Sequence, residues 1–134
     1  MSRRVVVNPG WEYVKRHTFS PGVRIGNLLC ISGLVSVDQE GRVVGKGDIV
    51  AQTRQIFENM KAILSAAGAS FDDVIRTTEY VTTWDNYKST SAVRREYFRE
   101  PFPAATGVLV SGLTGKDFLI EIEALVVLPE TRGH

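Results

Sequence analysis

The sequence has one cysteine, Cys30, and only two histidines, His17 and His134. A single cysteine excludes a disulfide or a thiolate metal cluster within one chain, and so few histidines argue against a histidine-based metal site. We therefore expect no bound metal. Cys30 has no evident base partner, so we expect it to be a small buried apolar side chain rather than a nucleophile.

The sequence also lacks long apolar runs and an excess of one charge. No segment approaches the roughly 18 consecutive apolar residues of a membrane-spanning helix, and the N-terminus has no apolar signal-peptide core. The 16 lysines and arginines nearly balance the 15 aspartates and glutamates, and the basic residues are scattered. Because nucleic-acid binding needs a concentrated basic surface, this pattern does not indicate it. We expect a cytoplasmic protein that binds neither membranes nor nucleic acid.

What the chain does contain suits one folded domain. It has 134 residues, of which 43% are hydrophobic, and we expect a single domain over residues 1–134. Its clearest element is a helix over residues 49–67, where apolar side chains recur every three or four positions. Asp48 is a suitable N-cap for this helix, and Gly68 is a natural stop.

Several short β-branched or apolar runs surround that helix. We expect a hairpin of residues 23–25 and 28–32 around Gly26-Asn27. A second helix is predicted over residues 86–98, capped by Thr83 or Asp85, with Lys88, Arg94 and Arg95 on its solvated side. Further strands are expected within residues 5–7, 73–83, 102–113 and 117–129. This order predicts an α+β fold, in which one mixed sheet carries both helices on one face.

The last predicted strand is apolar on both of its faces. Strand alternation places Ile120, Ile122, Ala124 and Val126 on one face and Leu119, Leu125 and Val127 on the other. Helices on one side of the sheet would leave the second set exposed, and exposed apolar surface of this kind usually marks a subunit contact. We therefore expect a closed homo-oligomer with the bare sheet faces turned inward.

Two acids lie on the second face of the same strand. Glu121 and Glu123 are surrounded by aliphatic residues, where desolvation tends to raise the pKa of a carboxyl group and suits it to proton transfer. The alternative is that both pair with basic residues of a neighbouring chain, because structural ion pairs also perturb pKa values. The sequence leaves both interpretations open.

Four stretches together resemble the RidA/YjgF family of reactive-intermediate deaminases, from about Pro21 to Leu128. They are "GNLLCISGLVSVD", "AQTRQIFENMKAILSAAGASFDDVIRTTEYV", "FPA" and "IEIEALV". The resemblance implies a chorismate-mutase-like fold and a homotrimer whose sheets line a central barrel. It also implies a small-molecule ligand in each cleft between subunits, hydrolysis of enamines and imines such as 2-aminoacrylate, and no cofactor or metal.

The resemblance also implies site residues. Glu121 matches a glutamate that positions or activates water, and Ser32, followed by Gly33, matches a serine of the early strand. Phe19 stands where the family has a tyrosine. Ala105 stands where the family pattern F-P-A-R has the arginine that binds the substrate carboxylate.

The missing arginine leaves three hypotheses. The first is a divergent deaminase-like hydrolase, in which Glu121 is catalytic and backbone groups near Thr106 and Gly107, with Ser32, bind a small enamine, imine or related metabolite. The second is a non-catalytic trimeric module that binds or senses a small ligand. The third is a standard enamine or imine deaminase whose cation has moved, for example to Arg24 or to an arginine of a neighbouring chain.

Overall fold

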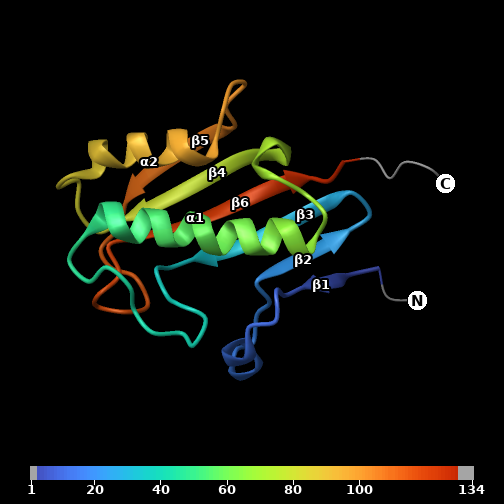
Figure 1. The fold of residues 1–134 in the computed structure, drawn as a ribbon. Helices are drawn as coiled ribbons and strands as arrows, with labels where there is room; N and C mark the ends of the chain where they lie inside the picture. Colours follow the sequence, from blue (N-terminus) through green and yellow to red (C-terminus); the bar gives the residue numbers. More distant parts are fainter. Residues whose placement is uncertain (1–2, 130–134) are drawn as a thin grey trace.

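The computed structural model describes residues 3–129, and within them one six-stranded sheet carries two α-helices (Figure 1). The strand order is β1-β2-β3-β6-β4-β5. Neighbouring strands are antiparallel except for β4 and β5, which are parallel. The strands are β1 (Val5–Val7), β2 (Gly22–Ile25), β3 (Leu28–Leu34), β4 (Val74–Val81), β5 (Ala104–Leu109) and β6 (Ile120–Val127). The helices are α1 (Ile49–Ala66) and α2 (Thr90–Tyr97), with short 3-10 helices η1 (Glu12–Arg16), η2 (Phe71–Asp73) and η3 (Tyr87–Ser89).

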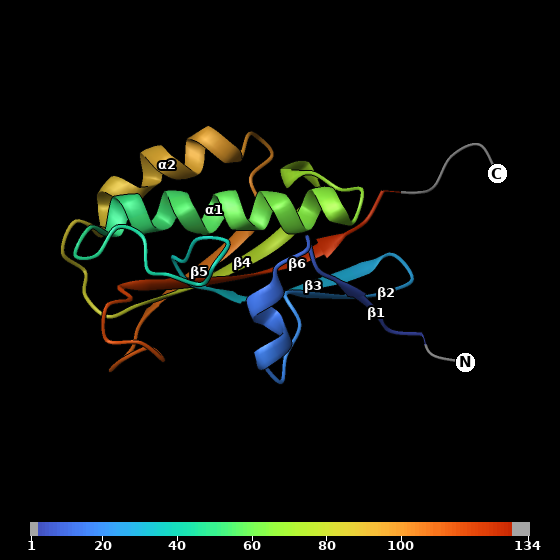
Figure 2. The ribbon, with the colours of Figure 1, turned by 60° about the horizontal axis from the view of Figure 1, so that its bottom comes forward.

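Both α-helices lie on the same side of the sheet (Figure 2). This arrangement confirms the predicted α+β fold with one mixed sheet and two helices on one face. Among residues 3–129, no α-helix covers the other face of the sheet. No helix among residues 3–129 is both long and apolar enough to cross a bilayer.

The long helix and the first hairpin form where the sequence predicts them. The Asp48 carboxylate accepts a hydrogen bond from the backbone N–H of Ala51 at 3.0 Å and so caps α1. Gly68 follows the helix with a φ of +75°, a conformation that favours glycine. Gly26, with a φ of +57°, makes the turn between β2 and β3.

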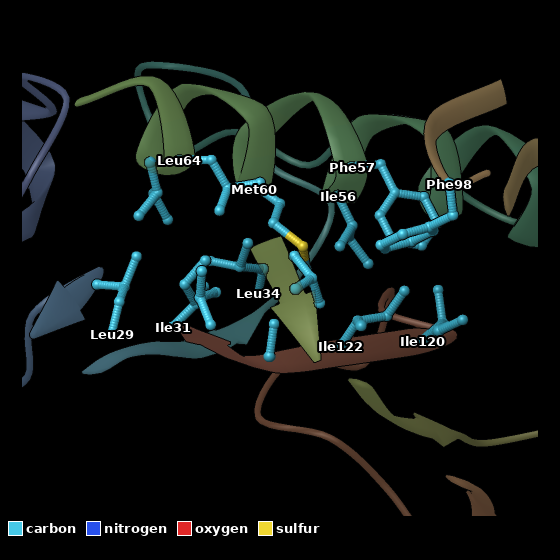
Figure 3. Packing of buried hydrophobic residues seen from close by; sticks show 14 of the residues in the cluster. Leu29, Ile31, Leu34, Ile56, Phe57, Met60, Leu64, Phe98, Ile120 and Ile122 are labelled. Carbon is cyan, nitrogen blue, oxygen red and sulfur yellow. The ribbon is translucent and has the colours of Figure 1, made fainter. Parts of the chain in front are cut away.

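The core lies between α1 and the covered face of the sheet (Figure 3). Side chains from successive turns of α1 pack against alternate residues of β3 and β6, as strand and helix periodicity requires. The predicted inward set on β6 is buried throughout. Fully or almost fully buried apolar members of this core include Leu29, Ile56, Phe57, Met60, Ile63, Ile120, Ile122 and Val126.

The second helix differs from its prediction in two respects. Thr83 accepts a hydrogen bond from the N–H of Asp85 and closes a turn before η3, so it does not cap α2. Arg94 was expected on the solvated side, but it forms an ion pair with Glu79 of β4, whose side chain is only 3% exposed. Thr90 and Val93 are the buried residues of α2, and Arg94 lies four positions after Thr90, on the same side of the helix.

The prediction that Cys30 is buried is wrong for the single chain. Leu29 and Ile31 occupy the core face of β3, so strand alternation places Cys30 on the uncovered face, where it is exposed. The uncovered faces of β6 and β3 also expose Leu28 and Val127. A homotrimer that covers this face stays a prediction.

Candidate active site

A cavity of about 580 Å³ is lined by residues of η1, β3 and β6 and of the loops that follow β3 and precede β6. Four residues singled out from the sequence line it together, although they lie far apart along the chain: Phe19, Ser32, Gly33 and Glu121. Its volume lies within the range of about 300–1,000 Å³ that is typical of small-molecule sites. Their roles in binding and catalysis stay predictions.

Glu121 lies directly over Gly33. A Cβ atom on Gly33 would lie 2.2 Å from Oε2 of Glu121, so the carboxylate occupies the space that any other side chain would need. The pairing register between β3 and β6 shifts between Ile31 and Leu34. Irregularities of this kind are frequent beside active sites, where they redirect the backbone. Here the irregularity and the absence of a side chain together let the Glu121 carboxylate lie against β3.

The Glu121 carboxylate is partly buried, and it has no partner in the part of the chain that the structure describes. Burial, and secondarily the charge of Glu123, raises the pKa of Glu121 above its usual range. Among residues 3–129 no hydrogen bond or ion pair to this carboxylate is found. Glu123 does have a partner, because the Tyr80 hydroxyl donates a hydrogen bond to its Oε1 at 3.0 Å. The two acids of β6 therefore differ, and Glu121 is the one suited to exchange a proton.

Ser32 organises the segment that enters the cavity. Its hydroxyl donates to the carbonyl of Ser20 at 2.5 Å, and its N–H donates to the carbonyl of Pro21 at 2.9 Å. These bonds fix the segment next to Phe19. Since the hydroxyl proton is already engaged, the oxygen is left as an acceptor for a ligand N–H or a water.

Sequence reasoning missed the wall formed around η1. Trp11, Tyr13, His17 and Phe19, here called the aromatic wall, all line the cavity and contact one another in order along the chain. A 3-10 helix of five residues has no apolar periodicity to reveal it. The available signal was the pairing of rings at positions 11 and 13 and again at 17 and 19.

Two side-chain amides of α1, one buried and one partly buried, hold loops beside the cavity. Gln52 of α1 is fully buried, and its Nε2 donates to the carbonyls of Gly45 at 3.1 Å and Asp117 at 2.9 Å. Its Oε1 accepts from the N–H of Leu119 at 2.9 Å. The Asn59 amide similarly donates to the carbonyl of Val37 at 2.9 Å. The loops on both sides of the cavity are thereby fastened to the rigid helix α1.

The remaining predicted residues are elsewhere in the single chain. Ala105, Thr106 and Gly107 lie on β5, and β4 separates that strand from β6. All three are exposed, and none lines the cavity. A Cβ on Gly107 would lie 2.8 Å from the Tyr87 hydroxyl, so this glycine makes room for a side chain on the helix-covered face. Their participation stays a prediction that requires β5 of a second copy.

Two arginines could replace the carboxylate-binding arginine of the family pattern, where this chain has Ala105. Arg24, proposed from the sequence as a replacement, lines a different hollow beside Gly26 and Leu128, and its Nε is buried without a hydrogen bond among the described residues. Arg16 at the end of η1 does line the cavity and is exposed. Within residues 3–129 no group of three or more His, Cys, Asp or Glu could hold a metal ion, and His134 lies outside the described residues.

Comparison with known proteins identifies the family. A sequence model of the family described as Endoribonuclease L-PSP matches residues 12–128. A RutC family protein of Pyrococcus horikoshii is 46% identical over 107 residues, which cover 80% of this chain and 84% of the relative. A 3-aminoacrylate deaminase, RutC, of Acinetobacter baylyi is 38% identical over the same shares. A 2-iminobutanoate/2-iminopropanoate deaminase of Dermatophagoides farinae is 32% identical, covering 82% of this chain and 85% of the relative.

Solved structures agree with this assignment. RidA from an Antarctic Psychrobacter is 34% identical, with a TM-score of 0.77 over 84% of this chain and 89% of that one. A protein named YJGH is 32% identical, with a TM-score of 0.85 over 97% of this chain and 100% of that one. The chain therefore belongs to the Endoribonuclease L-PSP family, the group of RidA/YjgF proteins.

Proposed function

We propose that the protein hydrolyses a small enamine or imine to a carbonyl compound and ammonia, with Glu121 as the catalytic residue. The observation that carries the proposal is a partly buried carboxyl group that has no hydrogen-bond or ion-pair partner among residues 3–129 and is held against Gly33 in a cavity of suitable size. Two relatives at 32% and 38% identity are named as deaminases of such compounds. The charge pattern gives no comparable support to a nuclease, since the net charge is only +1.

The chemistry needs one group that can give and take a proton. In its neutral form Glu121 donates a proton to the enamine carbon or the imine nitrogen, which makes the C=N carbon electrophilic. The resulting carboxylate accepts a proton from the attacking water, and a carbinolamine forms. Glu121 then gives its proton to the carbinolamine nitrogen, the C–N bond breaks and ammonia leaves. The hydroxyl proton returns to the carboxylate as the carbonyl forms. A raised pKa keeps the neutral form of Glu121 available at higher pH than an exposed glutamate.

We expect the working enzyme to be a homotrimer in which β5 of one copy approaches the cavity of another. In one chain β4 keeps Ala105 away from Glu121, and all of β5 is exposed. Exposed apolar side chains on the uncovered side of the molecule, including Leu28, Val108 and Val127, are suited to such contacts.

The substrate should differ from those that depend on the arginine of the family pattern. Ala105 cannot make the bidentate contact of a guanidinium with a carboxylate. Loss of one partner of a buried charged contact costs about 2–5 kcal/mol, or roughly 30- to several-thousand-fold in binding. An uncharged substrate, or one anchored at another point of the cavity, fits this site better.

A second candidate is a standard imino acid deaminase with a relocated cation, and Arg16 in the cavity lining favours it. Arg16→Gln should then lower kcat/KM for an imino acid by roughly 10- to 100-fold, the usual worth of a hydrogen bond to a charged group. Lys15→Gln is the matched control, because Lys15 is a neighbouring exposed cation of η1 that does not line the cavity.

The test of catalysis is Glu121→Gln. Imines are generated in situ by an L-amino acid oxidase, and the imine that remains is trapped with semicarbazide. We expect the substitution to reduce turnover by roughly 10²–10⁴-fold while the assembly and the unfolding temperature are kept. The pH profile of the parent should show an ionisation above the usual glutamate range that is absent from the variant. Loss of assembly without loss of turnover per assembled site would make Glu121 a structural residue. Failure of the parent to hydrolyse either an imino acid or an imine without a carboxylate would favour a binding module.

A gain-of-function variant tests independently whether position 105 lies near the substrate carboxylate. Ala105→Arg should raise kcat/KM for 2-iminopropanoate by roughly 10- to 100-fold, since it restores a charge-assisted contact. Ala105→Gln adds comparable length without the charge and should give no increase. Equal effects of the two substitutions would contradict the placement of Ala105 near the substrate carboxylate.

A further inference from the structure

The aromatic wall has features that a site for very small substrates does not need. The His17 and Phe19 rings are stacked, with centroids 4.8 Å apart and planes 16° apart. Tyr13 packs edge-on against His17 at 5.7 Å and an interplanar angle of 84°. Trp11 stacks on Tyr13 at 6.1 Å and is only 8% exposed, so it anchors the series in the core. The contacts between neighbouring rings thus hold the aromatic wall in place.

The end of the aromatic wall at Phe19 is open to solvent. Phe19 is 58% exposed, although it belongs to the cavity lining. No hydrogen bond to either ring nitrogen of His17 is found among residues 3–129. A flat apolar surface of this kind gains most from another ring, because aromatic pairs contribute beyond the area they bury.

The size and composition of the cavity also favour a ligand with an apolar ring. A substrate as small as 2-iminopropanoate would leave most of the 580 Å³ to water. The other apolar lining residues include Leu34, Val37 and Phe118, so this space favours an apolar group. The polar residues of the lining include Ser32 of β3 and Glu121 of β6.

From this arrangement we infer that the preferred substrate is a ring-bearing imine or enamine, whose ring stacks on His17 and Phe19 while its C=N group faces Ser32, Gly33 and Glu121. The inference rests on the proposed function for the identity of the reacting group. It adds the chemical class of the substituent and assigns His17 and Phe19 as specificity-determining residues.

Binding can be measured apart from catalysis with two stable amides, phenylacetamide and butanamide, by titration calorimetry. The parent protein should bind phenylacetamide at least about tenfold more tightly. Phe19→Leu and His17→Leu should each weaken phenylacetamide by roughly 3- to 10-fold and leave butanamide unchanged. His17→Phe keeps a ring and should retain the preference. Trp84→Leu is the matched control, because Trp84 is an exposed aromatic residue, 49% accessible, that does not line the cavity.

Turnover separates this inference from the proposed function. The imines derived from phenylalanine and alanine carry the same carboxylate, so the ratio of their kcat/KM values reports the side chain alone. A ratio that favours phenylalanine and falls in Phe19→Leu supports the inference. Equal hydrolysis of both imines, with no effect of Phe19→Leu, overturns the inference and leaves the proposed function standing. Selective binding of phenylacetamide without hydrolysis of either imine, or of a ring-bearing imine that lacks the carboxylate, overturns the proposed function and leaves the wall as the ligand-selecting surface.

Discussion

Gly33→Ala should separate activity from stability at the candidate site. The new methyl group would lie 2.2 Å from Oε2 and 2.8 Å from Cδ of Glu121. Ordinary contacts begin near 3.4 Å, so the carboxylate must retreat by about 1 Å. The carboxylate is the far end of a flexible side chain, and its retreat requires no backbone movement.

The expected cost in activity follows from this displacement. A misplacement of about 1 Å in a reacting group can reduce the rate by about 10²-fold, and we expect a loss of that order in kcat. Stability should change little. Gly33 does not have a left-handed φ, and alanine at a compatible position usually stabilises a protein by about 0.4–1 kcal/mol through the unfolded state.

The assay combines imine hydrolysis with urea unfolding of the same preparation. Gly112→Ala is the matched control, because a Cβ there would have no heavy atom within 4 Å. That variant should keep full activity. Undiminished activity of Gly33→Ala would refute the idea that Glu121 acts from its position over Gly33, and a parallel loss of activity and unfolding free energy would assign Gly33 to packing.

Three further outcomes are expected. Arg94→Met leaves the buried Glu79 carboxylate without its cation and should lower the unfolding free energy, measured by urea unfolding, by about 3–5 kcal/mol. Arg95→Met, on the exposed side of α2, is the control and should change the unfolding free energy by less than about 1 kcal/mol. Gln52→Leu removes three hydrogen bonds in the core and should cost about 3 kcal/mol, with faster amide exchange in the loop before β6. Light scattering at micromolar concentration should give a trimer, and a clean monomer would contradict the intersubunit site.

Much of the fold could be predicted because its main elements are long and periodic. α1 combines an apolar stripe with a side-chain cap at Asp48, and β6 alternates over eight residues. Such signals depend on local geometry and need no knowledge of the partner surface. η1 was missed because five residues of 3-10 helix carry no such period.

The candidate site was predicted less completely for the same reason. Glu121 and Gly33 could each be singled out, but their contact depends on the irregular pairing of β3 with β6, which no sequence pattern specifies. The burial of Cys30 was predicted wrongly because an apolar strand of a one-sided sheet does not reveal which alternate set faces the helices. Arg94 was misassigned because its partner lies on a strand fifteen residues earlier.

A comparison of two glutamates within the sheet bears most directly on function. Glu79 of β4 lies on the helix-covered face, 2% exposed, where Arg94 forms an ion pair with it and the Tyr87 hydroxyl donates to it at 2.6 Å. Burial and this hydrogen bond raise the pKa of Tyr87 to about 12, so the phenol remains a donor.

Glu121, on the adjacent strand, faces the cavity and has neither kind of partner among the described residues. A desolvated carboxylate without a partner destabilises a fold unless it is protonated or meets a ligand. Within the described part of the chain, the carboxylate on which packing depends has partners, and the one that lines a cavity has none. This difference, more than the presence of an acid in the family motif, is the physical reason for which we propose Glu121 as the catalytic residue.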